Sequence, residues 1–388
     1  MVLRKGALEA MSSKRMIRLS KSVIGDDEIF AAVSVMKREY FGMGIEVKDF
    51  ESELEAYFGR PAVCVVNGTA ALHLALEACG IGPGDEVLVQ SLTYVASFQA
   101  ISASGARPVA CEIDPRNLTL DLLDAERKIT ENTKALMPVH YSGDPGNIER
   151  VNEFAIRNGL RVIEDAAHAF GSNINGLKIG SFGDIACFSF DGIKNITSGE
   201  GGCVVTNDLD VIRKIRDSRL LGVVNDTENR FAGKRSWEFD VRAQGWRYHM
   251  SDLFAAIGRV QLKRSNQFIQ HRRHICRLYD ELIKKISYLE FFERDYANVA
   301  PHIYIVKILG GYDRGKLMAY LARAGVQTGI HYKPNHEHFY YRHSAPDGLQ
   351  KTEDIYPKLM TLPLHVGLSE DDVHYVVEKL SEYQGSEN

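Results

Sequence analysis

A single lysine, Lys194, stands in a turn between two short apolar runs, residues 187–190 and 203–206, that are expected to form buried strands. Burial lowers the pKa of an amine, and the neutral amine is the form that attacks carbonyl carbons. Lys194 is therefore a candidate Schiff-base lysine. The alternative is a lysine at the tip of a hairpin whose ammonium group remains in water. This stretch alone does not decide between the two.

A second candidate is the turn Asn67-Gly68-Thr69, which joins an apolar run at residues 62–66 to a helical pattern at residues 70–79. Backbone N–H groups at the start of a helix point outward without a partner in the helix, and they bind anions such as phosphate. An ordinary helix start with Thr69 as its N-cap would have the same sequence. Both interpretations remain open on this turn alone.

The elements that carry these residues alternate between short apolar strands and helices from residue 62 to residue 206. Such alternation predicts βαβ units and a mostly parallel sheet, in which ligands bind beyond the carboxyl ends of the strands. Five polar segments follow predicted strands: residues 67–69, 93–94, 140–141, 165–168 and 191–194. Their expected convergence on one edge of the sheet favours the chemical role for Lys194.

The composition is that of an ordinary soluble globular protein: 388 residues, of which 45% are hydrophobic and 25% charged. A net charge of −4 and an isoelectric point near 6.4 do not indicate a nucleic-acid or membrane partner. The six cysteines form no CxxC pair, as is typical of free thiols in a reducing compartment. The first twenty residues lack the apolar core of a secretory signal, and no apolar run is long enough to span a bilayer. We therefore expect a cytoplasmic protein.

Three parts of the chain differ in character. Residues 1–20 are predicted to be a mobile N-terminal lead, and residues 21–250 a large domain. Residues 251–388 begin with a long helical pattern and continue as a smaller α+β domain. Near the end of the large domain, residues 224–246 are predicted to form an irregular loop rich in charged and aromatic side chains.

Two further patterns are decoys. The segment GGYDRGK at residues 310–316 nearly matches a P-loop, but Leu317 replaces the hydroxyl residue that would hold magnesium, so we expect a strand-to-helix turn. Four histidines follow at positions 331, 336, 338 and 343. Their spacing fits neither HExxH nor a zinc finger, so we expect a polar substrate loop and no metal site.

The residues at the sheet edge match the needs of pyridoxal phosphate (PLP). This cofactor requires an amine for its aldehyde, a cradle for its phosphate, a flat partner for its ring and a carboxylate that keeps the pyridine nitrogen protonated. Asp165, at the end of an apolar strand, is the candidate carboxylate, because pairing with a pyridinium compensates a buried charge. Tyr94 is the candidate stacking ring.

Ordered sequence segments strengthen this interpretation: LSKSVIGDDEI (19–29), VVNGTAALHLAL (65–76), GDEVLVQSLTYVAS (84–97), IEDAAHAFGS (163–172), GDIACFSFDGIKN (183–195), GEGGCVVTND (199–208), MSDLFAAIGRVQL (250–262) and LPLHVGLSEDDV (362–373). With them the chain resembles, from about residue 17 to 380, the sugar aminotransferases of the DegT/StrS type. The resemblance implies PLP fold type I, in which helices sandwich a mostly parallel, seven-stranded sheet beside a smaller C-terminal α+β domain.

The resemblance also implies roles for individual residues. Lys194 would form the internal aldimine and shuttle a proton between the cofactor and the substrate carbon. Asp165 would pair with the pyridine nitrogen, His168 would hydrogen-bond the phenolic oxygen of the ring, and Tyr94 would stack on it.

Gly68, Thr69 and Ser189 would hold the phosphate. Members of this family are homodimers in which the partner subunit helps to hold the phosphate from a segment usually reading GYN. Here that segment is Gly245-Trp246-Arg247, so the role of Arg247 at the phosphate or at the nucleotide diphosphate stays open. His331 and Tyr332 match an element near the bound sugar.

The expected reaction is a ping-pong transfer of an amino group, usually from L-glutamate, to a keto group on a nucleotide-linked deoxysugar such as a 4-keto-6-deoxyhexose. It would serve the synthesis of deoxyamino sugars such as those of lipopolysaccharide O-antigen. Relatives that act as dehydratases carry histidine at the position of Lys194. The alternatives are a cyclitol or other keto-ring substrate, and a relative that binds PLP or sugar without catalysis.

Overall fold

The computed structural model describes residues 15–234 and 237–385; the first fourteen residues of the predicted N-terminal lead lie outside the described residues. A seven-stranded sheet forms the centre, with the strand order β1-β9-β8-β5-β4-β2-β3. Its strands are β1 (Ala62–Val65), β2 (Glu86–Gln90), β3 (Arg107–Cys111), β4 (Thr133–Met137), β5 (Arg161–Asp165), β8 (Ile185–Ser189) and β9 (Gly202–Thr206). β9 runs antiparallel to both neighbours and the other adjacent pairs are parallel, which confirms the predicted sheet.

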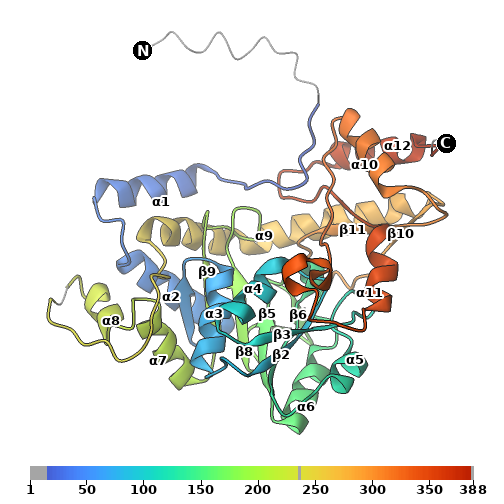
Figure 1. Cartoon of the computed structure of the whole chain (residues 1–388). Helices are drawn as coiled ribbons and strands as arrows, with labels where there is room; N and C mark the ends of the chain where they lie inside the picture. The colour runs from blue at the N-terminus through green and yellow to red at the C-terminus, as the bar shows by residue number, and fades with distance from the viewer. Residues whose placement is uncertain (1–14, 235–236, 386–388) are drawn as a thin grey trace.

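Helices cover both faces of this sheet (Figure 1). One face packs against α2 (Ile45–Phe58), α5 (Leu122–Arg127), α6 (Ile148–Asn158) and the first half of α9 (Asp252–Ile283). The other face packs against α3 (Gly68–Ala78), α4 (Val95–Ala103) and α7 (Leu209–Ser218). Alternate strand residues serve the two cores: Cys64 and Leu88 belong to the first, and Val65 and Val89 to the second. A sheet buried on both faces explains why its strands are apolar throughout.

The C-terminal part is built around α9, a helix of 32 residues that contacts α1 (Asp26–Lys37) and α2 near the sheet and α12 (Glu370–Glu382) farther along. Its own sheet has three antiparallel strands, β10 (Leu289–Phe291), β11 (Tyr304–Ile308) and β12 (Leu359–Leu362). The P-loop-like segment at residues 310–316 runs from β11 into α10 (Arg314–Arg323), so the predicted strand-to-helix turn is confirmed.

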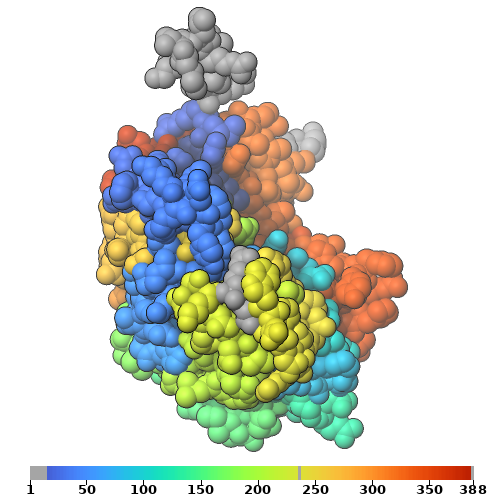
Figure 2. Space-filling model, turned by 90° about the vertical axis from the view of Figure 1, so that its left-hand side faces the viewer, coloured from blue at the N-terminus to red at the C-terminus, as the bar shows by residue number. Residues whose placement is uncertain are grey.

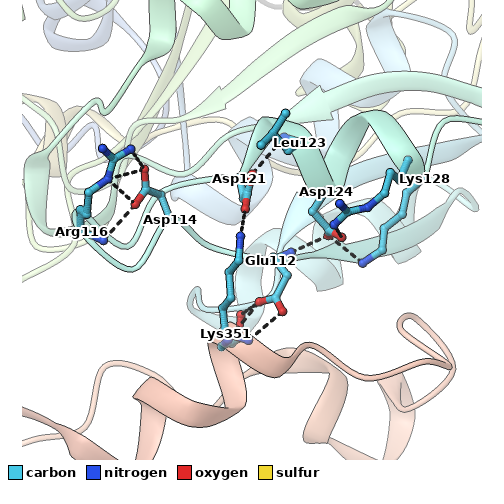
Figure 3. A network of polar contacts seen from close by, with 10 residues as sticks. Glu112, Asp114, Arg116, Asp121, Leu123, Asp124, Lys128 and Lys351 are labelled. Carbon is cyan, nitrogen blue, oxygen red and sulfur yellow. Dashed lines mark hydrogen bonds and ion pairs between the residues drawn. The ribbon is translucent and has the colours of Figure 1, made fainter.

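A segment of the C-terminal part, residues 333–358, folds back onto the large sheet. It contains α11 (Gln350–Ile355) and the short 3-10 turns Asn335–Glu337, Phe339–Tyr341 and Tyr356–Lys358. Tyr341 packs on Phe98 of α4, with ring centroids 5.1 Å apart. The buried carboxylate of Glu112 accepts the backbone N–H groups of Lys351 and Thr352, at 2.8 and 2.9 Å (Figure 3).

Several short elements were not predicted. The segment expected to be an irregular loop at residues 224–246 contains α8 (Asp226–Phe231), and a small hairpin, β6 (Asn173–Ile174) and β7 (Leu177–Lys178), follows β5. None of the helices within residues 15–234 and 237–385 combines the length and the apolarity that crossing a bilayer requires.

Candidate active site

A pocket of about 450 Å³ lies at the carboxyl ends of β5 and β8, where the sequence predicted it. It brings together nine predicted site residues: Gly68, Thr69, Tyr94, Asp165, His168, Ser189, Lys194, His331 and Tyr332. A larger hollow of about 670 Å³, between α5 and α6, is lined by ion pairs such as Asp114–Arg116 and contains none of these residues. The smaller pocket is therefore the candidate active site.

Lys194 is positioned by the turn that follows β8. Its backbone N–H donates to the carbonyl of Asp191 at 3.1 Å, and the Asp191 carboxylate accepts the N–H of Ile193 at 3.1 Å. The amine of Lys194 has no hydrogen-bond or ion-pair partner within the described part of the chain. Burial lowers its pKa to about 8, against the opposing effect of the Asp165 and Asp191 charges. A large fraction of the amine is therefore neutral near pH 8.

Gly202 explains the course of the return strand. A Cβ there would lie 2.6 Å from the carbonyl oxygen of Asn67 and 2.7 Å from that of Phe188. Neither Gly201 nor Gly202 lines the pocket. Gly202 thus allows β9 to pass closely between β1 and β8, which is a structural role.

Asp165 ends β5 with its carboxylate directed into the pocket. The hydroxyl of Ser97 donates to Oδ2 at 2.7 Å, and the backbone N–H of Ala167 donates to Oδ1 at 3.2 Å. These two donors fix the orientation of the buried carboxylate. Asp165 can therefore pair with a cationic group in the pocket.

His168 is held at both ring nitrogens. The backbone N–H of Ser142 donates to Nδ1 at 3.4 Å, and the hydroxyl of Tyr332 lies 3.1 Å from Nε2. Burial, with the nearby Lys194 and His331, holds the pKa of His168 well below its usual value. The ring is therefore neutral, and because Nδ1 accepts a hydrogen bond, the proton sits on Nε2, the nitrogen on the pocket side.

The turn before α3 leaves several donors open. Asn67, not the Thr69 considered from the sequence, is the N-cap: its side chain accepts the N–H of Ala70 at 2.8 Å. Within the described residues, the N–H groups of Gly68 and Thr69 have no hydrogen-bond acceptor. The oxygen of Ser189 accepts the N–H of Asp191 at 3.3 Å, which leaves the Ser189 hydroxyl proton free to donate. These donors suit a phosphate group.

Gly68 lies so close to Ser189 that a Cβ at Gly68 would come within 2.8 Å of the Cβ of Ser189. The glycine therefore keeps this end of the pocket open for a ligand. With the unpaired amine of Lys194 and the carboxylate of Asp165 in the same pocket, the donor set fits PLP: phosphate at the Gly68 end, aldehyde at the amine, pyridine nitrogen at the carboxylate.

The pocket lining also includes two residues from the C-terminal part, His331 and Tyr332. Tyr332 lies beside Tyr94, with ring centroids 5.4 Å apart, and Nδ1 of His331 lies 2.8 Å from the hydroxyl of Thr361 in β12. Burial, with a contribution from the charge of Lys194, lowers the pKa of His331 to about 4. His331 is therefore neutral at physiological pH.

Arg247 is the predicted site residue that does not line the pocket of its own chain; it is exposed and forms an isolated antiparallel bridge with Leu220. Two charged lining residues, Asp191 and Glu200, were not among the predicted site residues, although Asp191 falls in the polar segment 191–194 expected at the sheet edge. Burial, and then the charge of Asp191, raises the pKa of Glu200. Asp191 carried a usable signal, since it follows the end of a strand, whereas Glu200 stands in a glycine-rich return with no such signal.

Solved structures share this architecture. The PLP form of Spr1654 from Streptococcus pneumoniae aligns with a TM-score of 0.87 and 28% identity, over 95% of this chain and 98% of that chain. The fold and the pocket thus define a PLP-dependent transferase of fold type I. Over residues 22–381 the sequence matches the DegT/DnrJ/EryC1/StrS aminotransferase family, and the chain belongs to this family of PLP-dependent sugar aminotransferases.

Two relatives illustrate the family. The spore coat polysaccharide biosynthesis protein SpsC of Bacillus subtilis is 35% identical over 370 residues, which cover 92% of this chain and 95% of SpsC. The dTDP-4-dehydro-2,3,6-trideoxy-D-glucose 4-aminotransferase of Saccharopolyspora spinosa is 33% identical over 370 residues, with 94% and 96% covered. Both match this chain over nearly its whole length.

Proposed function

We propose that this protein transfers an amino group from L-glutamate to the keto carbon of a nucleotide-linked keto-deoxysugar, in a ping-pong reaction, and that the sugar is a 4-keto-6-deoxyhexose. One observation carries the proposal: a partly buried, unpaired amine at Lys194 shares a pocket with the carboxylate of Asp165 and the neutral ring of His168. The name of the Saccharopolyspora relative, a 4-aminotransferase of a dTDP-linked keto sugar, supports the substrate class.

The bound cofactor would supply an aldehyde for the amine and an electron sink for the carbon that loses its proton. Gly68, Thr69 and Ser189 would hold its phosphate through the open N–H and O–H groups. Asp165 would accept a hydrogen bond from the pyridine nitrogen and keep it protonated. His168, with its proton on Nε2, would donate to the phenolic oxygen of the ring, and Tyr94 would cover one face.

Lys194 would act as the base and acid that transfers the proton. The neutral Nζ would be the amine that holds the cofactor's aldehyde, and when it is free it would take the proton from the α-carbon of the amino donor and return it. The pKa of about 8 suits this exchange, because a base whose pKa lies near the working pH can both accept and return a proton. His331 and Tyr332, which line the same pocket, would contact the sugar.

We further propose that the working form is a homodimer in which Arg247 reaches the pocket of the partner subunit. Large apolar side chains stand exposed on α1, on the α1–α2 loop and at residues 237–241: Ile29, Phe30, Met36, Phe41, Trp237, Phe239 and Val241. The α1–α2 region and residues 209–250 lie side by side on one face of the molecule (Figure 2, blue and yellow-green). Exposed apolar side chains of this kind favour burial against a second copy of the chain. Arg247, which is exposed and does not line the pocket of its own chain, could then line the partner's pocket.

The product would be a deoxyamino sugar for a cell-surface polysaccharide such as O-antigen; the name of SpsC, which refers to spore coat polysaccharide, supports this use. All six cysteines are free, which favours a cytoplasmic setting.

Amination assays test the function directly. The PLP-loaded protein is incubated with L-glutamate and, in separate reactions, a TDP-linked 4-keto-6-deoxyhexose, a UDP-linked 4-keto sugar, a 3-keto analogue and a keto-inositol. We expect an aminated sugar nucleotide and 2-oxoglutarate with a 4-keto sugar, detected by mass spectrometry. Amination of the keto-inositol alone would replace the proposed substrate with a cyclitol. Bleaching of the cofactor by glutamate without amination of any acceptor would contradict the proposed sugar substrate.

A further inference from the structure

A line of buried hydroxyl groups leads to the carboxylate of Asp165. The hydroxyl of Ser97 is fully buried and donates to Oδ2 of Asp165 at 2.7 Å. The oxygen of Ser97 in turn lies 3.1 Å from the hydroxyl of Thr93. Because the Ser97 proton goes to the carboxylate, the Thr93 hydroxyl must be the donor to Ser97. The other acceptor near Ser97, the carbonyl of Tyr94, is farther away at 3.4 Å.

Asn335, a fully buried residue of the C-terminal part, holds the backbone around Thr93 in place. The side-chain amide of Asn335 donates to the carbonyls of Ser91 at 3.0 Å and Thr93 at 2.9 Å, and its backbone N–H donates to Ser91 at 2.9 Å. The next residue, His336, lies with Nδ1 2.7 Å from the Ser91 hydroxyl. Residues 91–93 therefore cannot shift without leaving buried polar groups unpaired.

The ionisable groups around Asp165 come from several elements. Lys194 follows β8, Cys187 lies in β8, His168 follows β5 and Tyr332 comes from the C-terminal part. Among these, the amine of Lys194 is the cation. Within the described residues none of these four groups hydrogen-bonds the Asp165 carboxylate, whereas the Ser97 hydroxyl donates to it at 2.7 Å.

We propose that Ser97 is a positioning residue which, backed by Thr93 and Asn335, holds the Asp165 carboxylate in one orientation, aligned with the pyridine nitrogen of the cofactor, and thereby keeps that nitrogen protonated. This inference rests on the role proposed above for Asp165 as the partner of that nitrogen. It needs no sugar substrate for its test.

The test loads the apo proteins with PLP labelled with ¹⁵N in the ring, because the ¹⁵N chemical shift reports whether the nitrogen is protonated. Ser97→Ala removes the donor, Ser97→Thr keeps it, and Ser102→Ala is the matched control. Ser102 lies on the same helix, and its hydroxyl contacts Tyr341 at 3.3 Å, away from the pocket. The dissociation constant of PLP and the thermal midpoint of each apo protein are measured alongside.

We expect Ser97→Ala to weaken PLP binding about tenfold, which corresponds to about 1.4 kcal/mol, and to move the loss of the ring proton to lower pH. Ser97→Thr and Ser102→Ala should match the wild type in both readouts. In an Asp165→Asn background, Ser97→Ala should add little further loss, because the charge it supports is gone. A folded Ser97→Ala protein with wild-type affinity and an unchanged ¹⁵N titration would overturn the inference. Failure of every sugar to react would overturn the proposed function and leave this result standing.

Discussion

The hydroxyl of Tyr332 lies 3.1 Å from Nε2 of His168, although the two residues are 164 positions apart in the chain. His168 follows a strand of the central sheet, whereas Tyr332 comes from the C-terminal part just before the segment that folds back. The contact joins two residues that line the same pocket. It ties the orientation of the His168 ring to a residue of the C-terminal part.

Tyr332→Phe should weaken PLP binding about tenfold, because the Tyr332 hydroxyl beside Nε2 holds the His168 ring in the orientation from which Nε2 would donate to the cofactor. Titration of the apo protein with PLP, followed by absorbance, measures the change. Tyr340→Phe is the matched control, since Tyr340 is 72% exposed. Equal losses in both variants would contradict a specific role for the Tyr332 hydroxyl.

Lys194→Ala should lower the rate of amino transfer by about 10²- to 10⁴-fold, the range expected when a catalytic base is removed. Borohydride reduction of the PLP-loaded wild type followed by peptide mass spectrometry should find the cofactor on Lys194. Lys134→Ala, at an exposed lysine outside the pocket, should leave turnover unchanged. Full turnover by the Lys194→Ala protein would contradict the proposed role of Lys194 as the catalytic base.

The rate at which the apo protein bonds covalently to PLP should rise with pH and level off above about pH 8. The reason is that the neutral amine is the reactive form and burial lowers the pKa of Lys194 to about 8. Stopped-flow absorbance at a fixed PLP concentration gives the profile. A midpoint near that of an ordinary lysine, about 10.4, would mean that the amine is not desolvated.

Mixing two inactive variants tests whether Arg247 acts in the partner's pocket. If it does, an equal mixture of Lys194→Ala and Arg247→Ala chains, unfolded and refolded together, should recover about a quarter of the wild-type sites, because half of the random dimers carry one intact pocket. Refolded wild type sets the upper limit, and each variant refolded alone sets the background. If Arg247 serves its own chain instead, the mixture stays at background.

Glu112→Ala should lower the free energy of unfolding by about 2–3 kcal/mol, because it strips the acceptor from two backbone N–H groups of α11 and from the hydroxyl of Thr352 (Figure 3). Chemical denaturation of the apo protein measures the loss. Lys351→Ala, which removes the exposed ion pair to Asp121, should cost less than about 1 kcal/mol. Similar costs for both would show that the buried carboxylate does not anchor the segment.

The central sheet and most residues that line the pocket were predictable because their signals are local. A strand that is buried on both faces is apolar throughout. A polar residue at its end, such as Asp165, is therefore easy to recognise. The strands β10 and β12 were not predicted, because strands this short form only by pairing with β11. Ser97 and Asn335 carry no local signal either, since their importance comes from hydrogen bonds across the fold.

The late position of Tyr332 and Asn335 in the chain has a consequence for biosynthesis. A nascent chain that has emerged as far as α9 already contains the strands of the central sheet, Lys194 and Asp165, yet it lacks the wall that covers His168 and the amide that pins residues 91–93. Domains generally fold as units during synthesis, the N-terminal one first. Tight capture of the cofactor must therefore wait until nearly the whole polypeptide has left the ribosome.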